Sequence, residues 1–330
     1  MYIIIKLFKF LDDKENKIMA MPQNTIRDWL CGPMVAVATP FKEDFSLDLD
    51  AYRDNLEFMI KGGVVTGNGS LLVAGAGGEH PALNVEERKE LWSVALEVAN
   101  GRVPVLSSIQ HTDYREIIKM AKYASDIGLD GVQLGPTYYY EPSESDALRL
   151  FEIVDAESDV MIMLYHTWWE GLTMSVDLVK QIGEIDSVKA VKWSAPDAKL
   201  FQDGLKAFAG DLVTIDNSVS HVWSNILGAN GFITHLSSFW PDYPDRIWKA
   251  LQAKDYASVP SILAQFKWGW QEWVGSVVKH TGGEGPFIKA AMEEVGLKAG
   301  PPRPPSVRPT KAHMDVLKKL MKDAGVPKVN

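Results

Sequence analysis

Lys192 is the residue whose type and position most directly suggest covalent chemistry. It follows the run VKAV at 188–191, which is typical of a buried strand, and it precedes Trp193. At the end of a buried strand, desolvation disfavours the ammonium form, so the amine is expected to be nucleophilic nearer neutral pH. Such an amine can form an imine with a carbonyl substrate. The alternative is an ordinary lysine whose ammonium group extends to solvent.

Two further features suit the same chemistry. Tyr165 follows the apolar run MIML at 161–164, and its phenol could relay the protons that imine formation requires. Gly77 and Gly78 lie in the segment GAGGE at 75–79, where backbone N–H groups can approach a carboxylate. The alternative for Tyr165 is an aromatic wall residue without a chemical role. The alternative for Gly77 and Gly78 is a plain tight turn.

The sequence lacks the signatures of several other mechanisms. The seven histidines form no H-E-x-x-H pair, so no metal site is expected. The segment GAGGE does not fit the dinucleotide pattern G-x-G-x-x-G, and no G-x-S-x-G hydrolase motif occurs. Cys31 is the single cysteine, so the chain can form no internal disulfide and needs no oxidising compartment.

Short apolar runs alternate with longer segments of helical periodicity, and the candidate residues lie at the ends of these runs. Strands are expected at 34–39, 71–73, 103–107, 131–134, 160–164, 188–191, 212–215 and 231–234. Helices are expected at 49–60, 85–99, 114–127, 144–154, 175–185, 198–208, 221–227 and 243–253. Eight strands that are each followed by a helix predict an α/β fold, a parallel (β/α)8 TIM barrel. In such barrels the catalytic groups lie at the carboxyl ends of the strands, as Lys192 and Tyr165 do.

The barrel is expected over residues 31–240, with extensions on both sides. No strand is predicted after Pro241, and helices at 256–274, 286–295 and 310–324 would form a C-terminal helical extension over 241–330. Within it, KAGPPRPP at 298–305 is too rich in Pro and Gly for a regular element. Residues 1–30 are expected to be an N-terminal extension, disordered or partly helical.

Composition restricts the partners. The 330 residues carry a formal net charge of −9 without basic clusters, so nucleic-acid binding is not expected. The apolar start MYIIIKLFKF is too short to cross a bilayer and lacks a small-residue cleavage site. A cytoplasmic protein without a membrane partner is therefore expected. A small anionic substrate remains compatible with this charge.

Taken together, the motifs resemble the dihydrodipicolinate synthase / N-acetylneuraminate lyase family over about residues 30 to 325. The matching segments are VAVATPF at 35–41, GAGGEHPAL at 75–83, GRVPV at 101–105, YYYEP at 138–142, LYH at 164–166, VKWS at 191–194 and RPP at 303–305. The resemblance implies a class I, Schiff-base mechanism on a 2-oxo acid such as pyruvate. It implies no metal or other cofactor, because the imine itself is the electron sink.

The resemblance also implies roles for individual residues. Lys192 matches the Schiff-base lysine, and Tyr165 matches the tyrosine that relays protons. The loop at Ala76, Gly77 and Gly78 would receive the 2-oxo acid carboxylate through backbone amides. Ile233 would line the imine. Tyr139 matches an aromatic residue that reaches a neighbouring subunit's site in the synthase branch, so a homo-oligomer, a dimer or a tetramer, is expected.

The sequence departs from the family pattern at several positions. Ala76 and Gly77 replace two hydroxyl residues of the family loop, so the synthase hydroxyl relay is not intact. His166 replaces the usual asparagine after the tyrosine, and Trp168 and Trp169 follow it. The synthase arginine for a second carboxylate has no clear counterpart. These changes count against lysine biosynthesis and against sialic acid cleavage.

The hydratase-aldolases that cleave arylidene-pyruvates are similar at two places, an aromatic residue after the lysine, here Trp193, and the KAGPxRPP strap. Trp168, Trp169 and Trp193 could pack an aromatic ring, and His166 could assist water or aldehyde. The expected products are then pyruvate and an aromatic aldehyde. A 2-keto-3-deoxy sugar acid dehydratase or aldolase, a dihydrodipicolinate synthase-like condensation and a non-catalytic 2-oxo acid-binding barrel stay open as alternatives.

Overall fold

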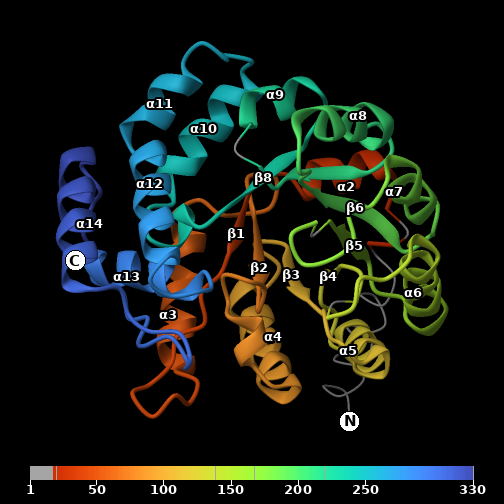
Figure 1. The fold of residues 1–330 in the computed structure, drawn as a ribbon, viewed down its shortest axis with the longest axis horizontal. Helices are drawn as coiled ribbons and strands as arrows, with labels where there is room; N and C mark the ends of the chain where they lie inside the picture. The colour runs from red at the N-terminus through yellow and green to blue at the C-terminus, as the bar shows by residue number, and fades with distance from the viewer. Residues whose placement is uncertain (1–17, 20, 138, 167, 219, 330) are drawn as a thin grey trace, which may run out of the picture. The chain divides into compact units, whose positions relative to one another are not determined.

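A closed barrel of eight parallel strands, arranged in chain order, forms the framework of this computed structural model (Figure 1). The structure describes residues 18–19, 21–137, 139–166, 168–218 and 220–329. The predicted TIM barrel is confirmed, and every predicted strand overlaps an observed one. The strands are β1 Gly32–Ala36, β2 Ser70–Val73, β3 Val105–Ser108, β4 Gly131–Leu134, β5 Ile162–Tyr165, β6 Val188–Trp193, β7 Val213–Asp216 and β8 Gly231–Thr234.

Two compact units make up the chain. The first comprises residues 1–31 and 105–232, and the second comprises residues 32–104 and 233–330. The C-terminal helices therefore group with β1 and β2. Of the predicted N-terminal extension, residues 1–17 and 20 lie outside the described residues, and part of the remainder is helical.

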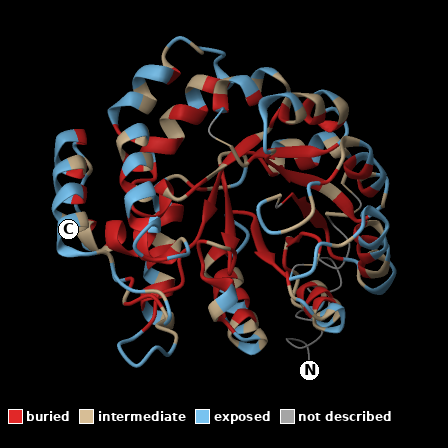
Figure 2. Cartoon of the chain, viewed as in Figure 1, coloured by how far each residue is buried: buried red, intermediate tan, exposed pale blue. Residues whose placement is uncertain are grey.

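In the first unit, helices lie on the outer side of the strands (Figure 1). They are α5 Tyr114–Asp126, α6 Glu144–Glu157, α7 Val176–Gly183, α8 Ala198–Phe208 and α9 His221–Ile226. A side-chain cap begins four of them, from Asp113, Ser143, Ser175 and Asp197, because these oxygens satisfy N–H groups that the first turn leaves unpaired. Nearly every strand residue is buried, while the outer helix faces are exposed (Figure 2).

Helix α2, Gln23–Trp29, lies at the start of the strands of this unit. The Arg27 guanidinium donates to the carbonyls of Ala209 and Leu212 and to Asn230 Oδ1. Ile26 is fully buried, and the Gln23 amide donates to the Lys189 carbonyl. Residues 209–212 and 230 precede β7 and β8, so α2 packs near the amino ends of these strands and leaves their carboxyl ends to the site.

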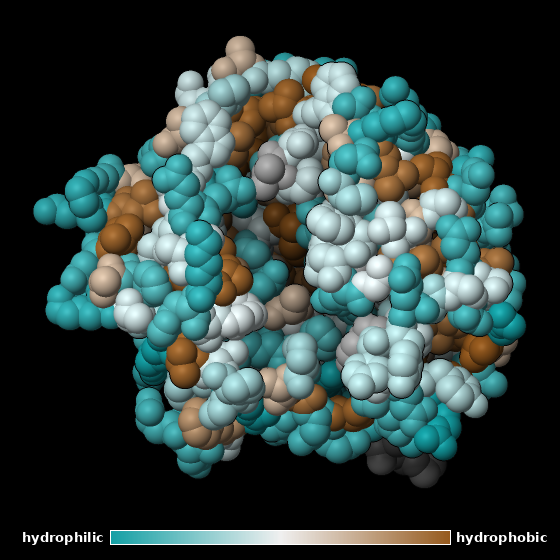
Figure 3. All heavy atoms as spheres, viewed as in Figure 1, coloured by the Kyte–Doolittle hydropathy of each residue, from teal (hydrophilic) through white to brown (hydrophobic). Residues whose placement is uncertain are grey.

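In the second unit, α3 Leu49–Lys61 and α4 Val85–Ala99 follow β1 and β2. After β8 come α10 Asp242–Gln252, α11 Val259–Gln265, α12 Lys267–Val278, α13 Gly285–Val295 and α14 Lys311–Ala324. Helix α14 is amphipathic, since Leu317, Met321 and Ala324 are buried and its exposed side, at the left of Figure 3, is mostly hydrophilic. Among the described residues, no helix has the length and apolar character needed to span a bilayer.

Candidate active site

A register shift between β5 and β6 brings Tyr165 opposite Lys192. Ile162 pairs with Val188, but Met163 already pairs with Ala190, so Lys189 is the extra residue of an irregularity of the β-bulge type. Without it Tyr165 would pair with Val191. Such bulges re-aim side chains and are over-represented next to active sites.

The amine of Lys192 lies against the ring of Tyr165. Its Nζ atom is 4.1 Å from the ring centroid, and each residue is only 5% exposed. The structure thus brings together, at the carboxyl ends of neighbouring strands, the two residues that the sequence predicts to be catalytic. A nucleophilic amine and a phenol at this spacing suit imine formation with proton transfer.

Two tryptophans follow on the loop after β5. Trp169 lies edge-on to Tyr165, with 6.0 Å between the ring centroids, and Trp168 lies edge-on to Trp169 at 5.5 Å. Trp169 is 47% exposed. We call residues 168–173 the tryptophan loop. Its aromatic surface is continuous with the ring that supports the Lys192 amine.

His166 has a partner on each ring nitrogen. Its Nδ1 atom is 2.6 Å from the Ser194 carbonyl oxygen, and its Nε2 atom accepts from the Met174 N–H at 3.1 Å. The ring is fully buried and stacks on Trp193 at 4.6 Å. A polar contact between His166 and substrate, as the sequence suggested, would require one of these hydrogen bonds to break.

Trp193 faces the helix layer. Its indole N–H donates to the Phe201 carbonyl in α8 at 3.0 Å, and its ring meets Phe208 edge-on at 5.1 Å. Trp193 has no exposed surface. The proposal that it contacts substrate is therefore not retained, because successive residues of a strand face opposite sides and Lys192 takes the other side.

In the second unit, the loop after β2 contains a row of backbone donors. Among the described residues, the N–H groups of Ala76, Gly77 and Gly78 have no acceptor within the protein. Buried N–H groups are rarely left unpaired, so this row is suited to an anion. A Cβ at Gly77 would lie 2.9 Å from the Ala36 Cβ, and one at Gly78 would lie 2.9 Å from the Val37 carbonyl oxygen. Only glycine fits at both positions.

The same loop is fixed by a buried ion pair. Lys289 of α13 lies 2.6 Å from Glu79 Oε1 and donates to the Pro301 carbonyl at 3.0 Å. Burial lowers the pKa of Lys289 to about 8, and Glu79 opposes that shift. Glu79 has a left-handed backbone, with φ of 57°. The ion pair therefore helps to hold a conformation that a side chain rarely adopts.

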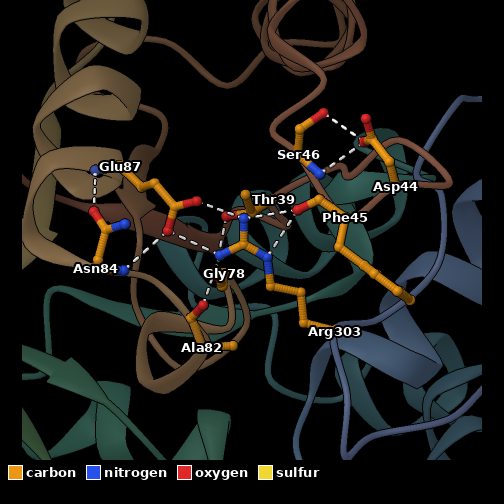
Figure 4. Close-up of polar contacts among 9 residues, drawn as sticks. All are labelled: Thr39, Asp44, Phe45, Ser46, Gly78, Ala82, Asn84, Glu87 and Arg303. Atoms are coloured by element: carbon orange, nitrogen blue, oxygen red, sulfur yellow. Dashed lines mark hydrogen bonds and ion pairs between the residues drawn. The ribbon is translucent and has the colours of Figure 1, made fainter.

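Arg303 of the predicted strap anchors the surrounding loops (Figure 4). Its guanidinium binds both carboxylate oxygens of Glu87 at 2.8 and 2.5 Å, and it donates to the carbonyls of Phe45 and Ala82. Its backbone N–H donates to Glu79, while Thr39 donates to the Gly78 carbonyl at 2.7 Å. This network supports the loop of residues 75–79, which we call the glycine loop, from several segments of the same unit.

The remaining predicted site residues are placed as follows. Ile233 is the least buried residue of β8. Tyr139 follows β4, is 83% exposed and has a φ of 88°. Its ring meets that of Tyr140 edge-on at 4.9 Å.

Sequence reasoning missed Lys289, since no local pattern shows that α13 packs against the glycine loop. In the described part of the chain, no group of three or more His, Cys, Asp or Glu is arranged to hold a metal.

Known proteins resemble this chain over most of its length. An uncharacterized DapA-like lyase of Thermococcus onnurineus is 28% identical over 298 residues, which cover 88% of this chain and 98% of the relative. The 4-hydroxy-tetrahydrodipicolinate synthase of Exiguobacterium sibiricum is 28% identical, covering 89% and 98%.

Solved structures share the fold. The crystal structure of a putative dihydrodipicolinate synthetase from Pseudomonas aeruginosa has a TM-score of 0.81 at 23% identity, and the match covers 89% of this chain and 99% of that one. A dihydrodipicolinic acid synthase family protein from E. coli K12, solved with pyruvate, has a TM-score of 0.81 at 24% identity, covering 90% and 99%. The model of the dihydrodipicolinate synthetase family matches residues 30–324, so this chain belongs to that family.

Proposed function

We propose that this enzyme cleaves, or in reverse forms, a C–C bond between pyruvate and an aromatic aldehyde. Enzymes of the family bind pyruvate as a Schiff base on a lysine, without a metal or another cofactor. The observation that carries the proposal is the Lys192 amine, 4.1 Å from the Tyr165 ring centroid at paired positions of β5 and β6. Lys192 is the nucleophile, and Tyr165 transfers the protons.

The reaction starts with imine formation. The Lys192 amine attacks the ketone carbon of an arylidene-pyruvate, and the oxygen leaves as water to give an iminium. Water then adds across the conjugated double bond, with its oxygen on Cγ and a proton on Cβ. Loss of the Cγ hydroxyl proton breaks the Cβ–Cγ bond, and its electron pair moves into the iminium to give an enamine. The aldehyde leaves, Cβ is protonated, and hydrolysis releases pyruvate.

Two features of the described residues support the substrate class. The unpaired N–H groups of Ala76, Gly77 and Gly78 suit the carboxylate of a 2-oxo acid, in line with the role that the resemblance gives them. Trp168 and Trp169, next to Tyr165, offer an aromatic surface for the substrate ring. The hydroxyls missing at 76 and 77 weigh against a polyol substrate, which makes 2-keto-3-deoxy sugar acids the second candidate.

A substrate panel tests the proposal. Arylidene-pyruvates, 2-keto-3-deoxy sugar acids and pyruvate with aspartate semialdehyde would be compared by kcat/KM. We expect kcat/KM to be about tenfold or more higher for the arylidene-pyruvates than for the other substrates, because burying one apolar ring face contributes about that factor. Trp169→Ala should remove that preference. Trp223→Ala, at a tryptophan of α9 that is 44% exposed, is the matched control. A preference for sugar acids would contradict the aromatic assignment.

We also propose that the enzyme is a cytoplasmic homo-oligomer. The exposed Tyr139–Tyr140 pair, which carries a strained backbone at Tyr139, is an aromatic surface of the kind that a second copy covers. One solved relative is a dihydrodipicolinate synthase variant described as monomeric, with a TM-score of 0.80 at 21% identity. Sedimentation of the purified protein would show whether it is a homo-oligomer or a monomer.

A further inference from the structure

His166 connects three segments of the first unit. Its backbone N–H donates to the Lys192 carbonyl at 3.2 Å, its Nδ1 atom meets the Ser194 carbonyl oxygen, and its Nε2 atom accepts from the Met174 N–H. The first two contacts join the end of β5 to residues on both sides of Trp193. The third contact joins the two ends of the tryptophan loop, since Met174 directly follows residue 173.

The partners fix the tautomer of the imidazole. A carbonyl oxygen can only accept, so Nδ1 must carry a proton and donate it in the hydrogen bond to the Ser194 carbonyl. A backbone N–H can only donate, so Nε2 must be unprotonated. Both nitrogens are satisfied only in the neutral Nδ1–H form. Burial lowers the pKa of His166 to about 4, which favours the same neutral form.

We infer that His166 is a positioning residue with two separable functions, holding Tyr165 against Lys192 through Ser194 and holding the tryptophan loop in its substrate-binding position through Met174. The inference rests on the proposed function, because it assigns the loop to the aldehyde-derived part of the substrate. The Nδ1 contact acts on the imine-forming pair. The Nε2 contact acts on the selection of the aromatic tail.

Two conservative variants separate these functions. His166→Asn places an amide at the position of Nδ1 and can still donate to Ser194, but it is too short to accept from Met174. His166→Gln places its amide oxygen at the position of Nε2 and can still accept from Met174, but it leaves the Ser194 carbonyl without its donor. Each variant therefore retains one contact, and each is checked for folding by circular dichroism and thermal melting.

We expect opposite effects on two measured steps. With pyruvate alone, borohydride trapping of the imine should stay near the wild-type rate in His166→Asn and fall about tenfold in His166→Gln. With an arylidene-pyruvate, KM should rise about tenfold in His166→Asn and stay near wild type in His166→Gln. His221→Asn is the matched control, because His221 is also buried in this unit and its Nδ1 atom bonds Asp216 instead.

Several outcomes would overturn the inference. Equal effects of the two variants on both steps would show a merely structural histidine. A limb of the wild-type pH–rate profile between pH 6 and 7 that both variants abolish would make His166 an acid–base group. Should one variant fail to fold, the other still tests its own step. Absence of a trapped imine in the wild-type enzyme would instead refute the proposed function, independently of His166.

Discussion

Lys192 and Tyr165 owe their proximity to backbone register. The irregularity at Lys189 advances β6 by one residue relative to β5, so Tyr165 meets Lys192 rather than Val191. Both side chains are almost fully buried, at 5% exposure each. The pairing of amine and phenol is thus a property of the strands, and each group can be removed separately.

Tyr165→Phe should remove the proton-transfer group while keeping the ring contact with the Lys192 amine. The ring that contacts the Lys192 Nζ atom is retained, while the hydroxyl is lost, so kcat should fall about 100-fold or more with little change in the thermal midpoint. Tyr114→Phe, at a tyrosine of α5 that is 51% exposed in the same unit, is the control and should leave kcat unchanged. A Tyr165→Phe enzyme with wild-type kcat would assign the proton transfer to another group.

Gly78→Ala should weaken carboxylate binding. An added Cβ would lie 2.9 Å from the Val37 carbonyl oxygen and 3.0 Å from the Ala74 nitrogen, so the loop must move and misplace its N–H groups. The KM for pyruvate should rise about tenfold. Gly75→Ala is the control, since its Cβ would have only ordinary contacts, with Leu72 at 3.4 Å. Equal KM values for both variants would argue against the anion site.

At the scale of elements, the layer of helices outside the strands fixes which strand residues can reach substrate. Trp193 fills the space against α8 so closely that a Cβ at Gly204 would lie 2.6 Å from its Cζ2 atom. Gly204→Ala should therefore destabilise the fold by about 1–3 kcal/mol through overpacking. Urea denaturation measures this change in the free energy of unfolding.

A second helical glycine provides the control. Gly275 of α12 has open space at its Cβ position, so Gly275→Ala should be stabilising by up to about 1 kcal/mol, because alanine has the higher helix propensity. If Gly204→Ala were as stable as Gly275→Ala, the close packing of Trp193 on α8 would be wrong. Trp193 would then have to be reconsidered as a residue that contacts substrate.

The Lys289–Glu79 ion pair links α13 to the glycine loop, and its pH dependence can be measured. Burial lowers the pKa of Lys289 from 10.5 to about 8, so between these values the unfolded chain binds more protons than the folded one. The free energy of unfolding of the wild type, relative to Lys289→Met, should therefore rise with pH across this window. The full change is at most about 3 kcal/mol.

Unfolding by urea at several pH values between 7 and 10 would test this expectation. Lys61→Met, at a lysine of α3 whose side chain is 75% exposed, is the control and should show no such slope. A flat difference between wild type and Lys289→Met would mean that the Lys289 ammonium is not desolvated in the folded protein.

At the scale of the whole molecule, the fold was predictable because it follows from local patterns. Alternating strand and helix periodicity predicts eight βα units, and the barrel then assigns Lys192 and Tyr165 to the carboxyl ends of strands. The orientation of Trp193 was also available from the sequence. Since side chains alternate along a strand, residues 192 and 193 cannot both face the same side.

Other features of the site depend on non-local packing and could not be predicted. The β5–β6 irregularity depends on how two strands align, and nothing in the letters VKAVKW marks Lys189 as the extra residue. Lys289 reaches Glu79 only because α13 packs against a loop more than 200 positions earlier in the chain. The tautomer of His166 depends on the backbone carbonyl of Ser194 and the backbone N–H of Met174. No side-chain pattern in the sequence shows that these backbone groups meet the ring.

Trapping of the imine tests the central claim most directly. The protein would be incubated with pyruvate, reduced with sodium borohydride, and examined by intact mass and by peptide mapping. A reduced pyruvate adduct on the peptide that contains Lys192, absent from Lys192→Ala, is the predicted result. No adduct with pyruvate or with a longer 2-oxo acid, or an adduct confined to a different lysine, would contradict the mechanism.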